Sequence, residues 1–162
     1  MNATPDAAPL AVTIVMVEDD EGHARLIEKN LKRAGVFNEV RHFLDGTSAL
    51  EFLVGTAGPR NGPGPGPGPG RGPEHRPLLV LLDLNLPDMS GFDVLAKLKA
   101  APHLRTTPVI VMTTTDDERE IRRGYELGCN VYITKPVNYE AFAQAVRQLG
   151  LLLAVIQVPP TP

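Results

Sequence analysis

The 162-residue sequence predicts an α/β domain in which a parallel sheet is covered by helices on both faces. Two observations lead to this fold class. Short apolar, β-branched segments alternate along the chain with segments whose apolar residues recur at helical spacing, and the pair occurs five times. Several strand segments are apolar throughout, as expected for strands that are buried on both faces.

The first part of the chain contains two strand–helix pairs. Ala11–Val17 is apolar and β-branched, which predicts a buried strand. Gly22–Ala34 predicts a helix, because its apolar residues recur every three or four positions before Gly35 ends the pattern. Glu39–Phe43 alternates polar and apolar residues and predicts a strand nearer the edge, and Gly46–Val54 predicts a short helix.

The central pair begins with Leu78–Asp83, the most apolar strand segment, which we expect at the centre of the sheet. Ser90 is a favourable N-cap for a helix over Gly91–Ala100. Pro102 follows this helix and cannot continue it, so the helix is expected to end before that residue.

The last part of the chain predicts two further pairs. Pro108–Met112 reads as a strand, and Asp116–Leu127 reads as a charged helix. Val131–Thr134 predicts the fifth strand, and Asn138 caps a last helix that extends towards Leu149.

Glycine and proline are concentrated in one segment. Residues 58–77 contain 14 Gly or Pro residues among 20, an arrangement that favours neither a helix nor a strand. We expect an exposed inserted loop there, and a docking site for a proline-recognising partner is the alternative. The predicted organisation is a flexible N-terminus (1–10), one domain (11–149) and an apolar C-terminal tail (150–162).

Composition excludes several classes of protein. Sixteen basic and nineteen acidic residues give a net charge of −3, without the basic surplus that is typical of nucleic-acid binders. The single cysteine, Cys129, excludes an internal disulfide framework. No apolar run reaches the roughly 18 residues of a membrane span, and the first residues lack the features of a secretory signal. We therefore expect a soluble, cytoplasmic protein that binds neither nucleic acid nor membrane.

Polar residues follow four of the predicted strands at the edge where open α/β sheets bind ligands. These residues are Glu18, Asp19 and Asp20 after the first strand, Asp83 at the end of the third and Asn85 after it, Thr113 after the fourth and Lys135 after the fifth. Carboxylates at such short distances repel one another unless a cation lies among them. Oxygen ligands without His or Cys partners favour Mg²⁺.

Each of these residues has a simpler explanation when it is taken alone. Acids commonly cap helices, threonine favours strands, and a lysine is usually a solvated charge. Asp83 is the exception, because it ends an apolar strand where an unpaired carboxylate has no structural role. Their joint position at the ends of different strands favours a functional site. None of the four histidines has a neighbour at metal-ligand spacing, so we expect them at surface or packing positions.

The sequence resembles the receiver domain of two-component response regulators over roughly residues 11–149. The matching segments are VMVEDDEGHARLIE, LLDLNLPDMSGFDVL, PVIVMTT and VYITKPV. The resemblance implies a flavodoxin-like fold with five parallel strands in the order 2-1-3-4-5 and five helices. The segments DEREIRRGYELGCNVYITKPVNY and LGLLLAVIQVP are more narrowly similar to stand-alone regulators that pair with bacterial phytochrome-type histidine kinases.

This resemblance implies that Asp83 accepts a phosphoryl group from a phosphohistidine of a kinase, so that the protein is a phospho-acceptor and not an enzyme with a separate substrate. It also implies a Mg²⁺ site formed by Asp83, by Asp19 directly, by Glu18 mostly through water and by the backbone carbonyl of Asn85. Phosphoryl transfer needs positioning and neutralisation of charge, which this set supplies.

The resemblance further assigns Lys135 and the Thr113 hydroxyl to the phosphoryl oxygens. Thr113 and Tyr132 are expected to be the switch residues, with a half-buried tyrosine of no switching role as the alternative for Tyr132. The Lys135–Pro136 bond is expected to be cis, as in the family. Asp20 is expected to lie outside the metal ligands and to compensate charge at a helix N-terminus.

Two alternatives from other classes stay open. A haloacid-dehalogenase-type enzyme also uses a strand-end aspartate and Mg²⁺, but it needs a second aspartate where Asn85 stands. A receiver-like interaction module that acts without phosphorylation is the second alternative. Few residues follow the last predicted helix, so we expect output by protein contact or by passing on the phosphoryl group.

The apolar segment Gly150–Val158, GLLLAVIQV, suggests an oligomer. As a helix it would be apolar around almost its whole circumference, which one domain face cannot bury. We expect a homodimer that uses this tail and the side of the fifth helix. A tail that folds back over its own domain is the alternative.

Overall fold

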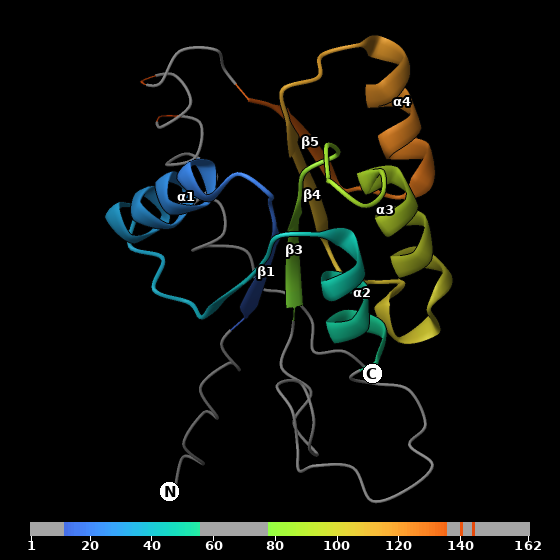
Figure 1. Ribbon diagram of the computed structural model, residues 1–162, viewed down its shortest axis with the longest axis horizontal. Helices are drawn as coiled ribbons and strands as arrows, with labels where there is room; N and C mark the ends of the chain where they lie inside the picture. The colour runs from blue at the N-terminus through green and yellow to red at the C-terminus, as the bar shows by residue number, and fades with distance from the viewer. Residues whose placement is uncertain (1–11, 56–77, 136–139, 141–143, 145–162) are drawn as a thin grey trace, which may run out of the picture.

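The structure, a computed structural model, describes residues 12–55 and 78–135 together with Glu140 and Gln144. Five parallel strands form one sheet in the order β2-β1-β3-β4-β5 (Figure 1). The strands are β1 (Thr13–Val17), β2 (Val40–Phe43), β3 (Leu78–Leu82), β4 (Val109–Thr113) and β5 (Val131–Thr134). The predicted fold class and strand order are confirmed.

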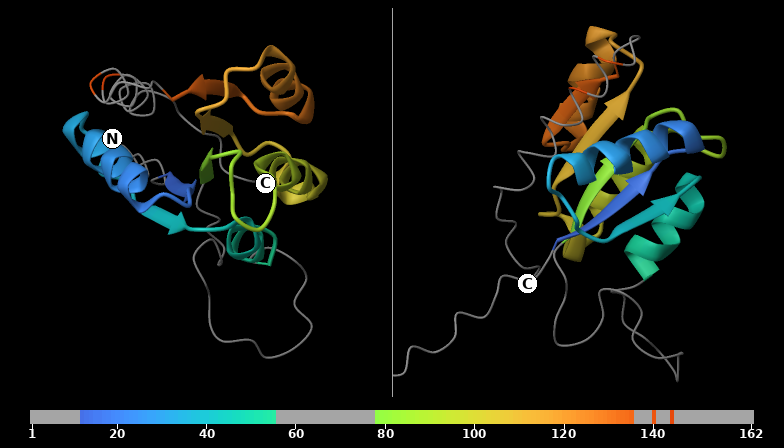
Figure 2. Two further views of the ribbon diagram at one scale, coloured as in Figure 1. Left: turned by 45° about the horizontal axis from the view of Figure 1, so that its top comes forward. Right: turned by 90° about the vertical axis from the view of Figure 1, so that its left-hand side faces the viewer.

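Helices cover both faces of the sheet. They are α1 (Glu21–Arg33), α2 (Gly46–Gly55), α3 (Gly91–Ala100) and α4 (Glu118–Leu127), with a short 3₁₀ helix at Pro102–Leu104. Helix α1 lies on one face, and α2, α3 and α4 lie on the other (Figure 2). The predicted last helix, the N-terminus, the Gly/Pro segment and the apolar tail lie outside the described residues, except that Glu140 and Gln144 have helical backbone.

Local sequence explains where the helices begin and end. The Asp20 side chain accepts a hydrogen bond from the His23 amide at 2.9 Å, and Ser90 accepts one from the Phe92 amide at 3.1 Å. Helix α4 starts two residues later than predicted, because Asp117 is its N-cap and not part of it. Gly128 ends α4 in the left-handed region, with φ of 107°, which glycine adopts without strain.

The hydrophobic core has two parts, one on each face of the sheet. Val15 and Val17 of β1 belong to the part beneath α2 and α3. Ile14 and Met16, which alternate with them, belong to the part beneath α1. Burial of each such side chain contributes about 1.5–3 kcal/mol to folding. The two parts together fix the central strands and therefore the positions of the residues that follow them.

Strand register decides which strand-end residues meet. Val17 pairs with Leu82 at the last position of the β1–β3 ladder, and the Asp83 amide donates to the Val17 carbonyl at 3.0 Å. Glu18 and Asp83 therefore leave adjacent strands at the same level.

Within residues 12–55 and 78–135, every helix is too short or too polar to cross a bilayer.

Candidate functional site

Three carboxylates gather at the carboxyl ends of β1 and β3. Carboxylate oxygens of Glu18, Asp19 and Asp83 all lie within 4.8 Å of one another. Glu18 is 2% exposed and Asp83 is 6% exposed, whereas Asp19 is exposed to solvent. The cluster therefore has two buried acids and one open side. Three hard oxygen donors with solvent access suit a divalent cation such as Mg²⁺.

Lys135 brings a positive charge into this cluster from the end of β5. Its backbone amide donates to the Thr113 carbonyl at 2.6 Å, which extends the β4–β5 pairing by one residue. Its Nζ donates to Glu18 Oε2 at 2.6 Å and to Asp83 Oδ2 at 3.1 Å, and all three side chains are buried. One ammonium thus neutralises part of the charge of the acids. The predicted cis bond involves Pro136, which lies outside the described residues.

The environment of Glu18 disfavours its ionised form. Burial raises the pKa of Glu18 to about 7, the hydrogen bond from Lys135 opposes this rise, and the charge of Asp83 adds to it. A carboxylate in this position is therefore costly to ionise beside Asp83, even with the lysine present. A further cation next to the acids would lower that cost.

The Asp83 carboxylate is held on both of its oxygens. The backbone amide of Asn85 donates to Oδ1 at 3.0 Å, while Lys135 occupies Oδ2. The side-chain amide nitrogen of Asn85 lies 3.5 Å from Oγ1 of the buried Thr113. Thr113, which is the last residue of β4, therefore lies next to Asn85, two residues after Asp83.

Asp20 takes the position expected of it. It is exposed, caps α1 and is not one of the three acids that approach one another. The hydrogen bond from the His23 amide lowers the pKa of Asp20. Its charge therefore serves the helix N-terminus.

The contacts of two further residues, His23 and Asp88, were not expected from the sequence. His23 Nδ1 lies 3.3 Å from Lys135 Nζ, although the spacing of the histidines indicated no site role. Asp88, in the loop after β3, accepts hydrogen bonds from the backbone amides of Gly46 and Thr47 at the start of α2. The sequence feature that could have indicated a site role for His23 is its position in the first turn of the helix that follows Glu18, Asp19 and Asp20.

Comparison with known proteins decides the family. Residues 71–147 match the family model described as the response regulator receiver domain. Response regulator Rcp1 of Synechocystis sp. is 36% identical over 134 residues, which cover 83% of this chain and 83% of Rcp1. The chain belongs to the response regulator receiver family.

Solved structures resemble this receiver over almost their whole length. A response regulator receiver domain from Rhodospirillum rubrum has a TM-score of 0.80 and 61% identity, and the match covers 93% of this chain and 99% of that one. The phosphorylated cyanobacterial phytochrome response regulator RcpA has a TM-score of 0.74 and 32% identity, with 92% and 99% covered. The Mn²⁺-bound form of Rcp1 has a TM-score of 0.74 and 31% identity, with 91% and 99% covered.

Tyr132 lies in β5 of the receiver, with its ring against α4. Its hydroxyl donates to the Thr115 carbonyl at 2.9 Å, and burial, followed by the charge of Glu120, raises its pKa to about 12. A methyl group on Gly124 of α4 would lie 3.2 Å from the Tyr132 ring, so the ring packs closely against this helix. The ring is half-buried, and its hydroxyl contacts the loop that follows Thr113 and β4.

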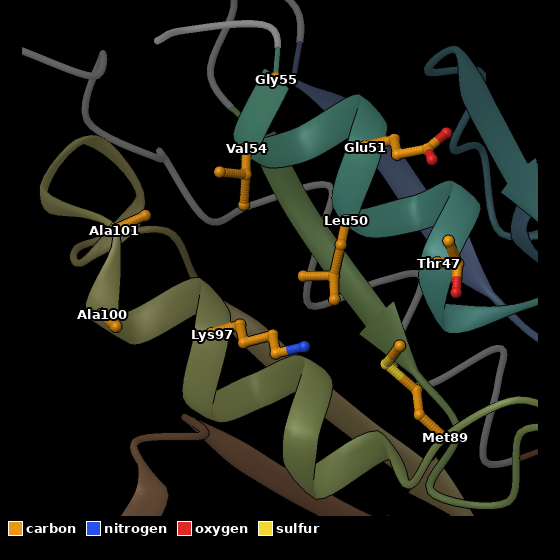
Figure 3. Close-up of a pocket in the computed structure, with 9 residues that line it drawn as sticks. All are labelled: Thr47, Leu50, Glu51, Val54, Gly55, Met89, Lys97, Ala100 and Ala101. Carbon is orange, nitrogen blue, oxygen red and sulfur yellow. The ribbon is translucent and has the colours of Figure 1, made fainter.

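A groove of about 710 Å³ lies apart from the acids, between α2 and α3 of the receiver (Figure 3). Its lining is Thr47, Leu50, Glu51, Val54, Gly55, Met89, Lys97, Ala100 and Ala101. The clustered acids Glu18, Asp19 and Asp83 do not line it, and neither do Lys135 and Thr113. The charged site at the strand ends is therefore separate from this groove.

Proposed function

We propose that this chain is a single-domain response regulator that accepts a phosphoryl group on Asp83 from a sensor histidine kinase in the presence of Mg²⁺. One observation carries the proposal. The buried Asp83 carboxylate is held between the Lys135 ammonium at 3.1 Å and the Asn85 amide at 3.0 Å, with the oxygens of Glu18 and Asp19 within 4.8 Å.

The transfer exchanges one bond to phosphorus for another. An Asp83 oxygen attacks the phosphorus of the phosphohistidine, a P–O bond forms, and the P–N bond breaks with its electron pair on the imidazole nitrogen. The Asn85 amide fixes Oδ1, and this contact sets the direction of the carboxylate. The Lys135 ammonium, already beside Oδ2, would move onto a phosphoryl oxygen with a short displacement.

The three acids fit a magnesium ion. We propose that Asp19 and Asp83 bind it directly, Glu18 mostly through water, and the Asn85 backbone carbonyl completes the protein ligands. The support is the donor set, three carboxylates of which one is exposed, and the Mn²⁺-bound form of the related Rcp1. When bound, the ion supplies positive charge to the phosphoryl oxygens.

The change of state is proposed to pass from Thr113 to Tyr132. The buried Thr113 hydroxyl lies near Asn85, where an oxygen of the new phosphoryl group would attract it. Tyr132 contacts the loop that follows β4 and packs on α4, so a shift of this loop would reach the surface formed by α4 and β5. Signalling would then use protein contacts at that surface or further phosphoryl transfer.

The kinase is proposed to be of the phytochrome type. The support is the likeness to RcpA, a phytochrome response regulator, at 32% identity and with 92% of this chain covered. We take residues 11–149 as the receiver, with residues 58–77 as an inserted loop and residues 150–162 as a separate tail.

The test is chemical phosphorylation of the purified chain. With acetyl phosphate and Mg²⁺, intact mass spectrometry is expected to show the gain of one phosphoryl group, and excess chelator should prevent it. A chain that gains no mass from acetyl phosphate or from a phosphorylated histidine kinase would instead be an interaction module that acts without phosphorylation.

Removal of the apolar tail is expected to convert a homodimer into a monomer. A chain that ends at Gly150 lacks the apolar residues Leu151–Val158, which one domain face cannot bury. Light scattering with and without acetyl phosphate measures the mass, and a chain that lacks residues 2–10 is the control and should stay dimeric. If the chain ending at Gly150 is still a dimer, the tail does not hold the two copies together.

A further inference from the structure

His23 lies at the mouth of the site, in the first turn of α1. Its backbone is fixed there, because its amide donates to Asp20 Oδ1 at 2.9 Å and the Asp20 amide donates to Glu18 Oε1 at 3.2 Å. Its side chain is 43% exposed, and Nδ1 lies 3.3 Å from Lys135 Nζ. One side of the imidazole thus faces solvent and the other faces the buried lysine.

The distances identify the bond that Nδ1 makes. Two carboxylate oxygens near Nδ1, Glu18 Oε1 at 3.7 Å and Asp20 Oδ2 at 3.9 Å, are both beyond hydrogen-bond distance. Lys135 Nζ is nearer, and an ammonium group only donates. Nδ1 therefore accepts a hydrogen bond from Lys135, with the imidazole hydrogen on Nε2.

Lys135 has three hydrogens to donate, and the described residues of the site supply three acceptors for them. Its ammonium has three hydrogens, and it is 5% exposed, so water has little access to replace a missing partner. Glu18 and Asp83 take two of these hydrogens, and His23 takes the third. An ammonium with all three acceptors has one defined position, whereas loss of one leaves a buried donor unpaired.

We propose that His23 is a positioning residue for phosphoryl transfer, which holds Lys135 Nζ between Glu18 and Asp83 through a hydrogen bond to Nδ1. The expected effect on the phosphorylation rate rests on the proposed function, whereas the contact between His23 and Lys135 does not. His23 does not belong to the group of candidate metal ligands, which is Glu18, Asp19 and Asp83. With a metal ion bound, the carboxylates would divide their charge between two cations, while the lone pair on Nδ1 would stay available to Lys135.

Two substitutions of similar size separate this role from simple packing. In His23→Asn, an amide oxygen takes the place of Nδ1, since both atoms are bonded to Cγ. In His23→Leu, a methyl group occupies that place and accepts nothing. Leucine is the better helix former, so a loss in this variant cannot come from helix propensity. His103→Leu is the control, because His103 contacts the Leu53 carbonyl and not the site.

The first measurement is the ¹H–¹⁵N signal of the Lys135 ammonium in the unphosphorylated, metal-free protein. His23→Leu is expected to shift this signal and to speed its exchange with water, while His23→Asn and His103→Leu leave it nearly unchanged. This measurement needs no phosphorylation. A chain that never labels would therefore overturn the proposed function, and the ammonium signal would still test the contact.

The second measurement is the rate of phosphorylation by acetyl phosphate at saturating Mg²⁺. The His23→Leu rate should fall roughly three- to tenfold, the effect of one net hydrogen bond, while His23→Asn stays within about twofold of the parent. The Mg²⁺ concentration for half-maximal rate should stay nearly constant in both. Equal behaviour of the Leu and Asn variants, or a shifted ammonium signal with an unchanged rate, would overturn the proposal.

Discussion

Asn in place of Asp83 is expected to abolish phosphorylation and to leave a folded protein that is at least as stable as the parent. The nucleophilic oxygen is lost, because a neutral amide does not attack phosphorus. Stability is kept because Lys135 still pairs with Glu18 at 2.6 Å. The charge of Asp83 is one cause of the raised pKa of Glu18, so its removal also relieves repulsion between the two buried acids.

Intact mass after treatment with acetyl phosphate and Mg²⁺, together with a thermal melt, measures both effects. Asp88→Asn is a matched control with the opposite pattern. Asp88 accepts hydrogen bonds from the Thr47 hydroxyl and from the backbone amides of Gly46 and Thr47, and these contacts, the hydroxyl first, lower its pKa to about 2. Its loss should leave labelling intact and reduce stability. Full labelling of the Asp83→Asn chain on the same peptide would show that another residue is the acceptor.

Ala in place of Gly91 is expected to destabilise the fold by about 1–3 kcal/mol and to slow phosphorylation. A Cβ at this position would overlap the Asp83 carbonyl oxygen and lie 2.6 Å from Leu84 Cα. Both neighbours are backbone atoms, so the end of β3 would have to move, and Asp83 would move with it. Helix propensity alone predicts the opposite sign, since Gly91 begins α3.

Urea unfolding and the labelling rate with acetyl phosphate test this expectation. Gly55→Ala is the control, because Gly55 ends α2 and, apart from its chain neighbours and the backbone of its own helix, no described residue has a heavy atom within 4 Å of the added methyl group. That variant should be neutral or slightly more stable, with an unchanged rate. If Gly91→Ala matches it in both measurements, the contact between α3 and the end of β3 is loose enough to absorb a methyl group.

The order of the elements could be predicted from the sequence because burial leaves a local pattern. β1 and β3 are buried along almost their whole length, and their segments are correspondingly apolar. The first and last residues of the helices were harder to predict, since they depend on which side chains cap the helix ends. Asp117 reads as part of a charged helix, but its side chain accepts from the Arg119 amide and so marks the residue before α4.

The site could be predicted only as a set of strand ends. That Glu18 and Asp83 lie side by side depends on the pairing of Val17 with Leu82, which no local pattern specifies. The contact of His23 with Lys135 joins residues 112 positions apart. The direction of the His23 side chain depends on how α1 packs on the sheet, which the local sequence does not specify. Asp88 is similar, because its cap on α2 depends on the path of the loop after β3.

The attachment points of the Gly/Pro segment have a practical consequence. Helix α2 runs back from the carboxyl edge and ends at Gly55, and β3 starts at Leu78, so both points lie at the amino edge of the sheet. Asp83 stands at the other edge, a full strand away. The connection is therefore where evolution could lengthen the chain without disturbing its chemistry. For the same reason it is a natural place for a fluorophore or an immobilisation tag that leaves the acceptor open to its kinase.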